Sequence, residues 1–208
     1  MDKQNRSDAA AWNERYDKGQ TGWDIGEPAP PFVDYVENGS LLNFAPEKSS
    51  LLVPGCGRGH DALYFAQQGF EVTALDFAPT AIAEGIERAR KTPLRGSIQF
   101  AVADFFQLPE KYHGKFDYAA EHTLFCAIEP SLRPQYARVM HQVLKPGGLL
   151  LAIFWAHHRA GGPPYSTTPA EIQELFTPYF EIEHLELAAR SHLRRANEEF
   201  FGVLRKKD

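Results

Sequence analysis

The chain reads Leu51-Leu52-Val53-Pro54-Gly55-Cys56-Gly57-Arg58-Gly59 about a quarter of the way along its length. The apolar run at its start is typical of a short buried strand, which stops at the proline and the glycines. A helical pattern follows from His60 to Gln68 and closes on Gly69. Glycines at such a turn let a ligand approach the backbone and allow torsions that a side chain would forbid. Because the spacing is G-x-G-x-G and not G-x-G-x-x-G, the turn favours a ligand other than a dinucleotide pyrophosphate.

The same alternation of strand and helix continues along the chain. The predicted strands are Ser50–Val53, Glu71–Leu75, Ile98–Val102, Phe116–Ala120, Leu149–Phe154, Phe180–Leu187 and Glu198–Leu204. The predicted helices are Ala9–Asp17, Pro30–Glu37 (ending near Asn38-Gly39), His60–Gln68, Pro79–Lys91, Arg133–Val143 and one that begins with the capping-box pair Thr168 and Glu171. Alternation at this rhythm predicts an α/β fold with a doubly wound sheet.

The final two β-like runs have no long helix between them. We therefore expect them to form an antiparallel hairpin, which places an antiparallel edge strand on a mostly parallel, seven-stranded sheet. In such sheets ligands bind at the carboxyl ends of the strands, where the strand order reverses. The loops after the first five strands are where we expect functional residues.

The composition is that of one globular domain. The chain has 208 residues, 43% of them apolar and 12% aromatic, enough for one sizeable core, so we expect a single domain over residues 1–208. A formal net charge of −5 gives no electrostatic reason to expect nucleic acid. A small molecule fits better as a partner, and no protein partner is evident.

Neither secretion nor a membrane is indicated. The polar start, Met1 to Asn5, lacks the apolar core of a signal peptide. The longest apolar stretches, such as Leu149 to Ala156, fall far short of a membrane span, so the expected location is cytoplasmic. We interpret Cys56 and Cys126 as reduced thiols, and no ligand spacing indicates a metal.

Two carboxylates follow predicted strands. Asp76 ends the second strand, where a carboxylate can accept both ribose hydroxyls of an adenosine, although it could also cap the helix at Pro79. Asp104 ends the third strand and could bind an adenine amino group, with Phe105 or Phe106 covering the ring. These two phenylalanines could instead be core residues, and we expect one of them to be.

The turn Lys145-Pro146-Gly147-Gly148 precedes the fifth predicted strand. Such a turn is common in class I methyltransferases and is not a feature of dinucleotide dehydrogenases. With the glycine turn, Asp76 and Asp104 it predicts the class I methyltransferase (Rossmann-like) fold, with S-adenosyl-L-methionine as the cofactor.

The sequence resembles the thiopurine S-methyltransferase superfamily, and most closely its halide and thiol (thiocyanate) methyltransferase branch. The resemblance runs from about Trp12 to Phe176 and includes motifs that flank the common methyltransferase core. Its matching stretches are Trp12-x-x-x-Tyr16-x-x-Gly19-x-Thr21-Gly22-Trp23-Asp24, Val53-Pro54-Gly55-Cys56-Gly57, Gly59-His60-Asp61, Leu75-Asp76, Asp104-Phe105-Phe106, Leu124-Phe125-Cys126-Ala127-Ile128-Glu129-Pro130 with Arg133, and Gly161-Gly162-Pro163-Pro164-Tyr165.

The resemblance implies a cofactor pocket covered by an N-terminal helical and aromatic lid within residues 1–40. Trp12, Tyr16 and Trp23 would line this pocket, with Gly55, Asp76 and Asp104 as further contacts. Physical chemistry agrees, since the cofactor carries a sulfonium cation, which aromatic faces attract by about 2 kcal/mol when it is desolvated. Alternatively these aromatics brace the first helix, and for Tyr16 both interpretations are open.

The sequence departs from that branch at specific positions. Tyr16 stands where the branch usually has tryptophan, and Glu121-His122 replaces the usual Asp-Tyr pair. His122 could contact the cofactor, act as a base or substrate contact, or be structural. His157, His158 and Arg159 could attract an anionic substrate or form an exposed loop.

The predicted reaction is in-line displacement of the methyl group by a soft nucleophile: a thiol, sulfide, thiocyanate or halide, with thiopurines a further candidate. Thiols are already partly ionised near neutral pH, so no catalytic side chain is required and none is assigned. Three alternatives stay open: a methyltransferase for another nitrogen, oxygen or metalloid (tellurite-type) substrate, a nicotinamide (NAD) oxidoreductase, and a non-catalytic binder of an adenosine ligand.

Overall fold

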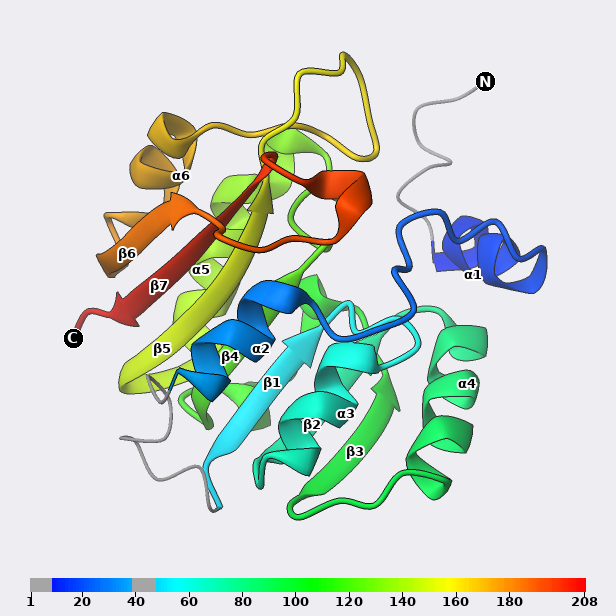
Figure 1. Cartoon of the computed structure of the whole chain (residues 1–208). Coiled ribbons are helices and arrows are strands. Elements are labelled where there is room, and N and C mark those ends of the chain that lie inside the picture. Colours follow the sequence, from blue (N-terminus) through cyan, green and yellow to red (C-terminus); the bar gives the residue numbers. More distant parts are fainter. Residues whose placement is uncertain (1–8, 39–47) are drawn as a thin grey trace.

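A seven-stranded sheet with the strand order β3-β2-β1-β4-β5-β7-β6 forms the centre of the molecule (Figure 1). The computed structural model describes residues 9–38 and 48–208, so the predicted helix end at Gly39 and the first eight residues lie outside the described part. The strands are β1 (Ser50–Pro54), β2 (Glu71–Asp76), β3 (Ser97–Val102), β4 (Phe116–His122), β5 (Leu144–Trp155), β6 (Phe180–Leu187) and β7 (Glu199–Lys206). The predicted fold class is confirmed.

Strands β1 to β5 pair in parallel, whereas β7 is antiparallel to both of its neighbours, β5 and β6. The predicted antiparallel hairpin at one edge is therefore present. Its outer strand is β6, and β7 lies one place further in. The strand order reverses between β1 and β4, and this places the ligand-binding edge above the glycine turn.

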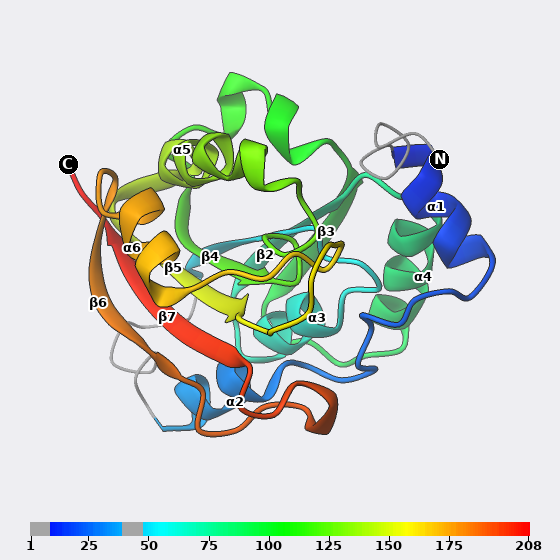
Figure 2. The same ribbon diagram turned by 90° about the horizontal axis from the view of Figure 1, so that it is seen from above.

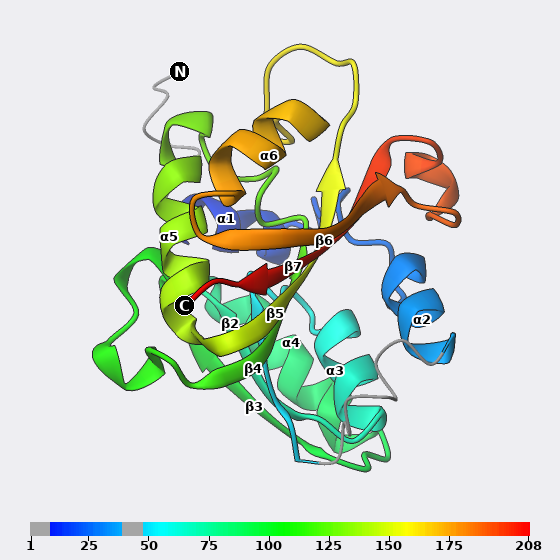
Figure 3. The ribbon, with the colours of Figure 1, turned by 90° about the vertical axis from the view of Figure 1, so that its left-hand side faces the viewer.

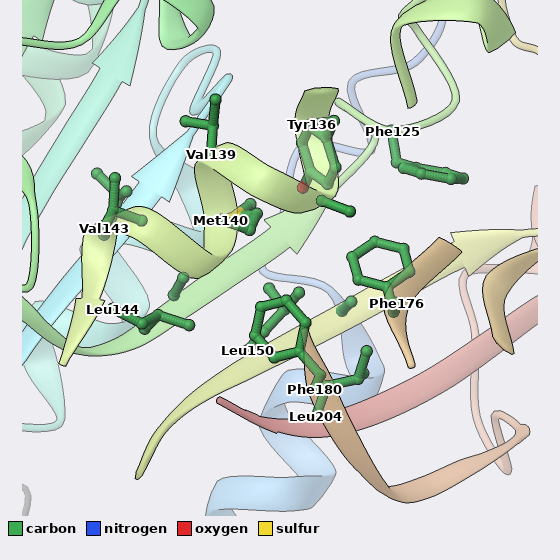
Figure 4. Close-up of a cluster of buried hydrophobic side chains, with 14 of the residues drawn as sticks. Phe125, Tyr136, Val139, Met140, Val143, Leu144, Leu150, Phe176, Phe180 and Leu204 are labelled. Carbon is green, nitrogen blue, oxygen red and sulfur yellow. The ribbon is translucent and has the colours of Figure 1, made fainter. Parts of the chain in front are cut away.

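Six α-helices among the described residues flank the sheet: α1 (Ala9–Asp17), α2 (Pro30–Glu37), α3 (His60–Gln67), α4 (Pro79–Arg90), α5 (Arg133–Val143) and α6 (Pro169–Phe176). Figure 3 shows α2, α3 and α4 on one face and α5 and α6 on the other. Alternate strand residues supply the two cores, so Leu51 packs toward α2 and α3 and Leu52 toward α5 and α6. Figure 4 shows the second core. Each buried side chain of this size stabilises the fold by about 1.5–3 kcal/mol.

The sequence predicts that the Lys145-Pro146-Gly147-Gly148 turn precedes the fifth strand, and this prediction is wrong. The turn lies inside β5. Residues 145–148 bulge opposite Asp117, because the pairing of β4 with β5 passes from Phe116–Leu144 to Tyr118–Leu149. Lys145 Nζ donates to Asp117 Oδ1 (2.8 Å), and Arg205 Nη1 donates to the carbonyl of Gly147 (3.0 Å). These distant partners hold the turn against the sheet.

The capping box of α6 is only half formed. Thr168 Oγ1 accepts a hydrogen bond from the amide of Glu171 (3.2 Å), as the sequence predicted. The Glu171 carboxylate does not return to Thr168 but accepts from Arg133 Nη1 (2.7 Å) and Thr167 Oγ1 (2.8 Å). The Arg133 guanidinium on α5 thus binds the Glu171 carboxylate in place of the Thr168 backbone amide.

The N-terminal helix α1 lies beside the start of α4, at the carboxyl-end edge of the sheet (Figure 2). The Thr80 amide donates to Asn13 Oδ1 (2.8 Å), and the Thr80 hydroxyl donates to Asp17 Oδ1 (2.6 Å). This attachment places one face of α1 over the strand ends. Among the described residues, no helix combines the length and apolar character needed to cross a bilayer.

Candidate active site

A cavity of about 750 Å³ opens at the carboxyl ends of the parallel strands. This volume is within the range typical of small-molecule sites, roughly 300–1,000 Å³. All of the predicted site residues line it: Trp12, Tyr16, Trp23, Gly55, Asp76, Asp104, Phe105 and His122. Residues 157–159 are not in its wall. Parallel strands end at the same edge, so loops far apart in the sequence meet here.

Gly55 and Gly57 give the turn after β1 a shape that other residues would strain. Their φ angles are 60° and 51°, in the left-handed region that favours glycine. A Cβ atom at Gly57 would lie 2.9 Å from the Tyr16 hydroxyl. The missing side chain lets α1 approach the turn, so the turn and α1 form adjoining parts of the wall.

Asp76 fixes the same turn from the end of β2. Its Oδ2 accepts from the Gly57 amide and its Oδ1 from the Ala78 amide, each at 2.9 Å. The residue is 7% exposed, and burial raises its pKa. An ionised carboxylate has about four acceptor positions, so Asp76 keeps capacity for a ligand. The expected capping role is present in altered form, since the carboxylate binds the residue before α4.

Asp104 organises the short helix η3 (Phe105–Gln107) after β3. Its Oδ1 accepts from the Phe106 amide (2.9 Å) and its Oδ2 from Gln107 Nε2 (2.7 Å). Phe105 is 5% exposed and packs on Tyr136 with ring centroids 5.4 Å apart, so it is largely a core residue that touches the cavity. Phe106 is only partly buried and also lines the wall.

The aromatic residues of the N-terminal segment (residues 9–38) contact one another. The Trp23 ring centroid lies 5.0 Å from that of Trp12 and 5.6 Å from that of Tyr16, both edge to face. The Arg15 guanidinium lies 4.7 Å from the Trp12 centroid, and that of Arg58 lies 5.5 Å from the Tyr16 centroid. These faces already hold cations, the charge type of a sulfonium. Tyr16 is buried, braces this cluster and lies against the glycine turn, which supports the bracing interpretation, and its contact with the cofactor stays a prediction.

Arg58 ties the N-terminal segment to the glycine turn, a role that sequence reasoning missed. Its Nη1 donates to Thr21 Oγ1 and Asp24 Oδ2, both at 2.8 Å, and its Nε donates to Glu84. Burial opposes ionisation of Asp24, but contacts with His60 and Arg58 hold its pKa well below the usual value. A charged arginine inside a G-x-G-x-G turn was the available signal.

His122 uses both ring nitrogens within the protein. Nδ1 lies 2.8 Å from Asp61 Oδ2, and Nε2 lies 2.7 Å from Arg195 Nη1. A guanidinium only donates, so Nε2 is the acceptor and Nδ1 carries the proton. In this arrangement His122 has no free nitrogen for a substrate. Arg195 and its partner Glu199 were not foreseen from the sequence, where adjacent arginines before two glutamates are only a weak signal.

The two cysteines in the wall are free thiols, as the sequence suggested. Burial raises the pKa of Cys126 to about 12 and that of Cys56 well above its ordinary value. A thiol becomes a nucleophile as its thiolate, so neither cysteine is an activated nucleophile at neutral pH.

The doubly wound sheet, the glycine turn after β1, and the acids after β2 and β3 around one cavity define a class I methyltransferase fold and site. The sequence pattern of the thiopurine S-methyltransferase (TPMT) family matches residues 7–207, a longer span than the motifs had suggested. The chain belongs to this family and is an S-adenosylmethionine-dependent methyltransferase. The alternatives of a nicotinamide oxidoreductase and a non-catalytic binder are thereby set aside.

Named relatives agree with this assignment. The probable thiol methyltransferase 2 of Arabidopsis thaliana is 36% identical over 171 residues, which cover 82% of this chain and 73% of that protein. Thiocyanate methyltransferase 1 of Brassica oleracea is 31% identical over 197 residues, covering 94% of this chain and 84% of that protein. The fold is shared with the Burkholderia thailandensis 1,6-didemethyltoxoflavin-N1-methyltransferase, solved with 1,6-didemethyltoxoflavin and S-adenosylhomocysteine, at a TM-score of 0.73 and 21% identity over 96% of this chain and 87% of that one.

Proposed function

We propose that the enzyme transfers the methyl group of S-adenosylmethionine to a small soft nucleophile: a thiol, sulfide, thiocyanate or halide, thiopurines included. One observation carries the choice of acceptor. The acids that end the strands and His122 are engaged by the protein itself, so these groups of the described wall are not poised as general bases. An acceptor that reacts without giving up a proton to the enzyme suits such a site.

Each of these groups has a protein partner. Asp61 faces His122, Asp76 and Asp104 accept from backbone amides, and Glu129 accepts from the Tyr165 hydroxyl. Asp24 binds Arg58. His60 differs from the other groups, because its buried Nε2 lies 3.2 Å from Asp24 Oδ1 without making a hydrogen bond. The remaining acid of the described wall, Glu27, is solvent-exposed. Oxygen and nitrogen acceptors usually lose a proton during methylation, and a soft anion does not.

The residues present fit the cofactor. Asp76 retains acceptor capacity, which supports a role in binding the ribose hydroxyls, and Asp104 in the same wall would bind the adenine amino group. The aromatic cluster of Trp12, Tyr16 and Trp23 would face the cationic end of the ligand. When bound, S-adenosylmethionine supplies a methyl group on a positively charged sulfur.

The chain's own contribution is alignment and exclusion of water. A soft anion that meets a sulfonium loses charge in the transition state, so a dry, apolar wall favours the reaction. Ile128, Leu132, Trp155, Pro163 and Pro164 supply apolar wall surface. Holding two reactants in line contributes several kcal/mol without an acid or a base.

The names of the relatives support this acceptor class, since two of them are a thiol and a thiocyanate methyltransferase. A cytoplasmic location is part of the proposal, because Cys56 and Cys126 are free and thiols persist in reducing compartments.

The test is a panel of acceptors with purified enzyme and S-adenosylmethionine. Sulfide, thiocyanate, iodide and tellurite are assayed by headspace gas chromatography, and an aromatic thiol and a thiopurine by liquid chromatography. We expect methylated product from at least one sulfur or halide acceptor and none from matched phenol and amine controls. Methylation of tellurite, a phenol or an amine alone would overturn the acceptor class while leaving the family assignment intact.

A further inference from the structure

Residues 23–29, called the strap here, connect the aromatic cluster to α2. Trp23, Asp24, Ile25 and Glu27 of the strap line the cavity wall. The carbonyl of Trp23, at one end, accepts from Arg195 Nη2. The amide of Ala29, at the other end, donates to Asp61 Oδ1 at 2.7 Å. The strap is therefore held at both ends by side chains from the body of the protein.

These two anchors are joined through His122. Its Nδ1 lies 2.8 Å from Asp61 Oδ2, and its Nε2 lies 2.7 Å from Arg195 Nη1. An unbroken series of hydrogen bonds thus runs from the Ala29 amide through Asp61, His122 and Arg195 to the Trp23 carbonyl. Its members come from α3, the end of β4, and the short helix η6 (Leu193–Arg195). A few short contacts therefore connect the two anchors.

Arg195 is the residue on which most of these contacts converge. It is 2% exposed, and its Nη1 also lies 3.2 Å from Glu199 Oε1, whose side chain is 3% exposed. Its guanidinium carbon lies 4.6 Å from the ring centroid of Trp155, another residue of the wall. A planar fork of donors can satisfy an imidazole, a carboxylate and a carbonyl together, and a lysine ammonium at the same place cannot.

The neighbouring arginine provides a natural comparison. Arg194 also binds the strap region, through Nη1 to the Gly22 carbonyl (3.2 Å) and Nη2 to the Asp24 carbonyl (2.9 Å). It is solvent-exposed and makes no contact with His122 among the bonds of the described residues. The two residues therefore share the strap and differ in their connection to the cavity wall.

We propose that Arg195 is a positioning residue for methyl transfer: through His122 and the Trp23 carbonyl it sets the closed position of the strap over the cofactor site. This role depends on the methyltransferase activity of the family and not on the identity of the acceptor. It assigns function to the segment between β6 and β7, which the motifs of the cofactor site do not include.

The test compares Arg195→Lys, Arg195→Gln and Arg194→Gln. Affinity for S-adenosylhomocysteine is measured by calorimetry and unfolding by urea titration, so the readout does not require a known acceptor. We expect Arg195→Lys to weaken binding by at least tenfold, equivalent to about 1.4 kcal/mol, and Arg194→Gln by less than threefold. Arg195→Lys keeps a charge opposite Glu199, so it guards against the unfolding that Arg195→Gln risks.

Hydrogen exchange provides the readout that a merely structural role would not move. In Arg195→Lys we expect faster exchange at the strap amides, with the strands of the sheet unchanged. His122→Asn should add little to Arg195→Lys, because the series of hydrogen bonds is already broken. Wild-type affinity in Arg195→Lys, equal losses in the two arginine variants, or faster exchange spread over the sheet would overturn the assignment. Absence of product from every acceptor, with these binding results intact, would count against the proposed acceptors alone.

Discussion

Replacing Glu121 with glutamine removes a titration from the interior of the protein while keeping the side chain's shape. Glu121 is 0% exposed at the end of β4, and its carboxylate accepts from the Tyr136 hydroxyl and from the Phe125 amide (3.0 Å). Burial raises its pKa to about 7, despite these hydrogen bonds. The unfolded chain releases this proton near the ordinary value of 4.5. Between these two values the folded protein holds a proton that the unfolded chain has lost.

The sign of the effect follows from that difference. Because the unfolded state binds fewer protons in this window, the free energy of unfolding falls as the pH rises from about 4.5 to about 7. At 1.36 kcal/mol per pKa unit, the loss attributable to Glu121 reaches about 3 kcal/mol. Glutamine has no proton to release. Its carboxamide can accept from the Phe125 amide and donate to the Tyr136 oxygen, so the packing and hydrogen bonding are retained.

The measurement is urea unfolding of the wild type and Glu121→Gln at intervals from about pH 5 to about pH 8. Other titrating groups act equally in both proteins and cancel in the difference. We expect the free energy of unfolding of Glu121→Gln, relative to that of the wild type, to increase by about 2–3 kcal/mol as the pH rises across this range. Glu110→Gln, at an exposed carboxylate, serves as the control and should run parallel to the wild type. Parallel curves for Glu121→Gln would refute a buried carboxyl group that gains its proton on folding.

Two further predictions concern the glycine turn. Asp76→Ala should weaken S-adenosylhomocysteine binding more than tenfold, about 1.4 kcal/mol, in calorimetry. An unchanged affinity would mean that Asp76 only holds the glycine turn and does not bind the cofactor. Gly57→Ala and Gly114→Ala should each lose about 1–2 kcal/mol of stability in urea unfolding, since both positions have positive φ (51° and 57°). Only Gly57→Ala should also lose cofactor affinity, because only its Cβ would meet Tyr16, at 2.9 Å; equal affinities would contradict this contact.

The sequence was sufficient for the fold where local signals and periodicity agree. Helix α5 begins and ends at the predicted residues, Arg133 and Val143, and α4 begins at the predicted Pro79. The bulge at residues 145–148 was interpreted as a turn before the strand, because its partners Asp117 and Arg205 lie far away in the chain. Lys145-Pro146-Gly147-Gly148 has the same local composition in either arrangement, and only the sheet distinguishes them.

The candidate site, like the fold, could be predicted from the sequence only in part. Residues at strand ends, such as Asp76 and Asp104, could be placed because the topology brings all such ends to one edge. Arg195 could not, since it meets His122 across 73 positions and no pattern near either residue indicates the other. A structural role was one of the interpretations that the sequence left open for His122, and only the fold shows its contacts with Asp61 and Arg195.

The position of β7 has a consequence for how the protein is made. A ribosome delivers β6 before β7, yet among the described residues β6 pairs only with β7, and one edge of β5 also stays unpaired until β7 is made. Until β7 emerges, the nascent chain carries two unpaired strand edges. Such edges can pair with other chains and aggregate, or be bound by chaperones. Arg195 and Glu199 emerge in the same interval, long after α1 and the aromatic cluster. A translation product interrupted after β6 therefore has the glycine turn, its acids and the contacts of Thr80 and Arg58 with the N-terminal segment, but it lacks the Arg195 contact with the Trp23 carbonyl.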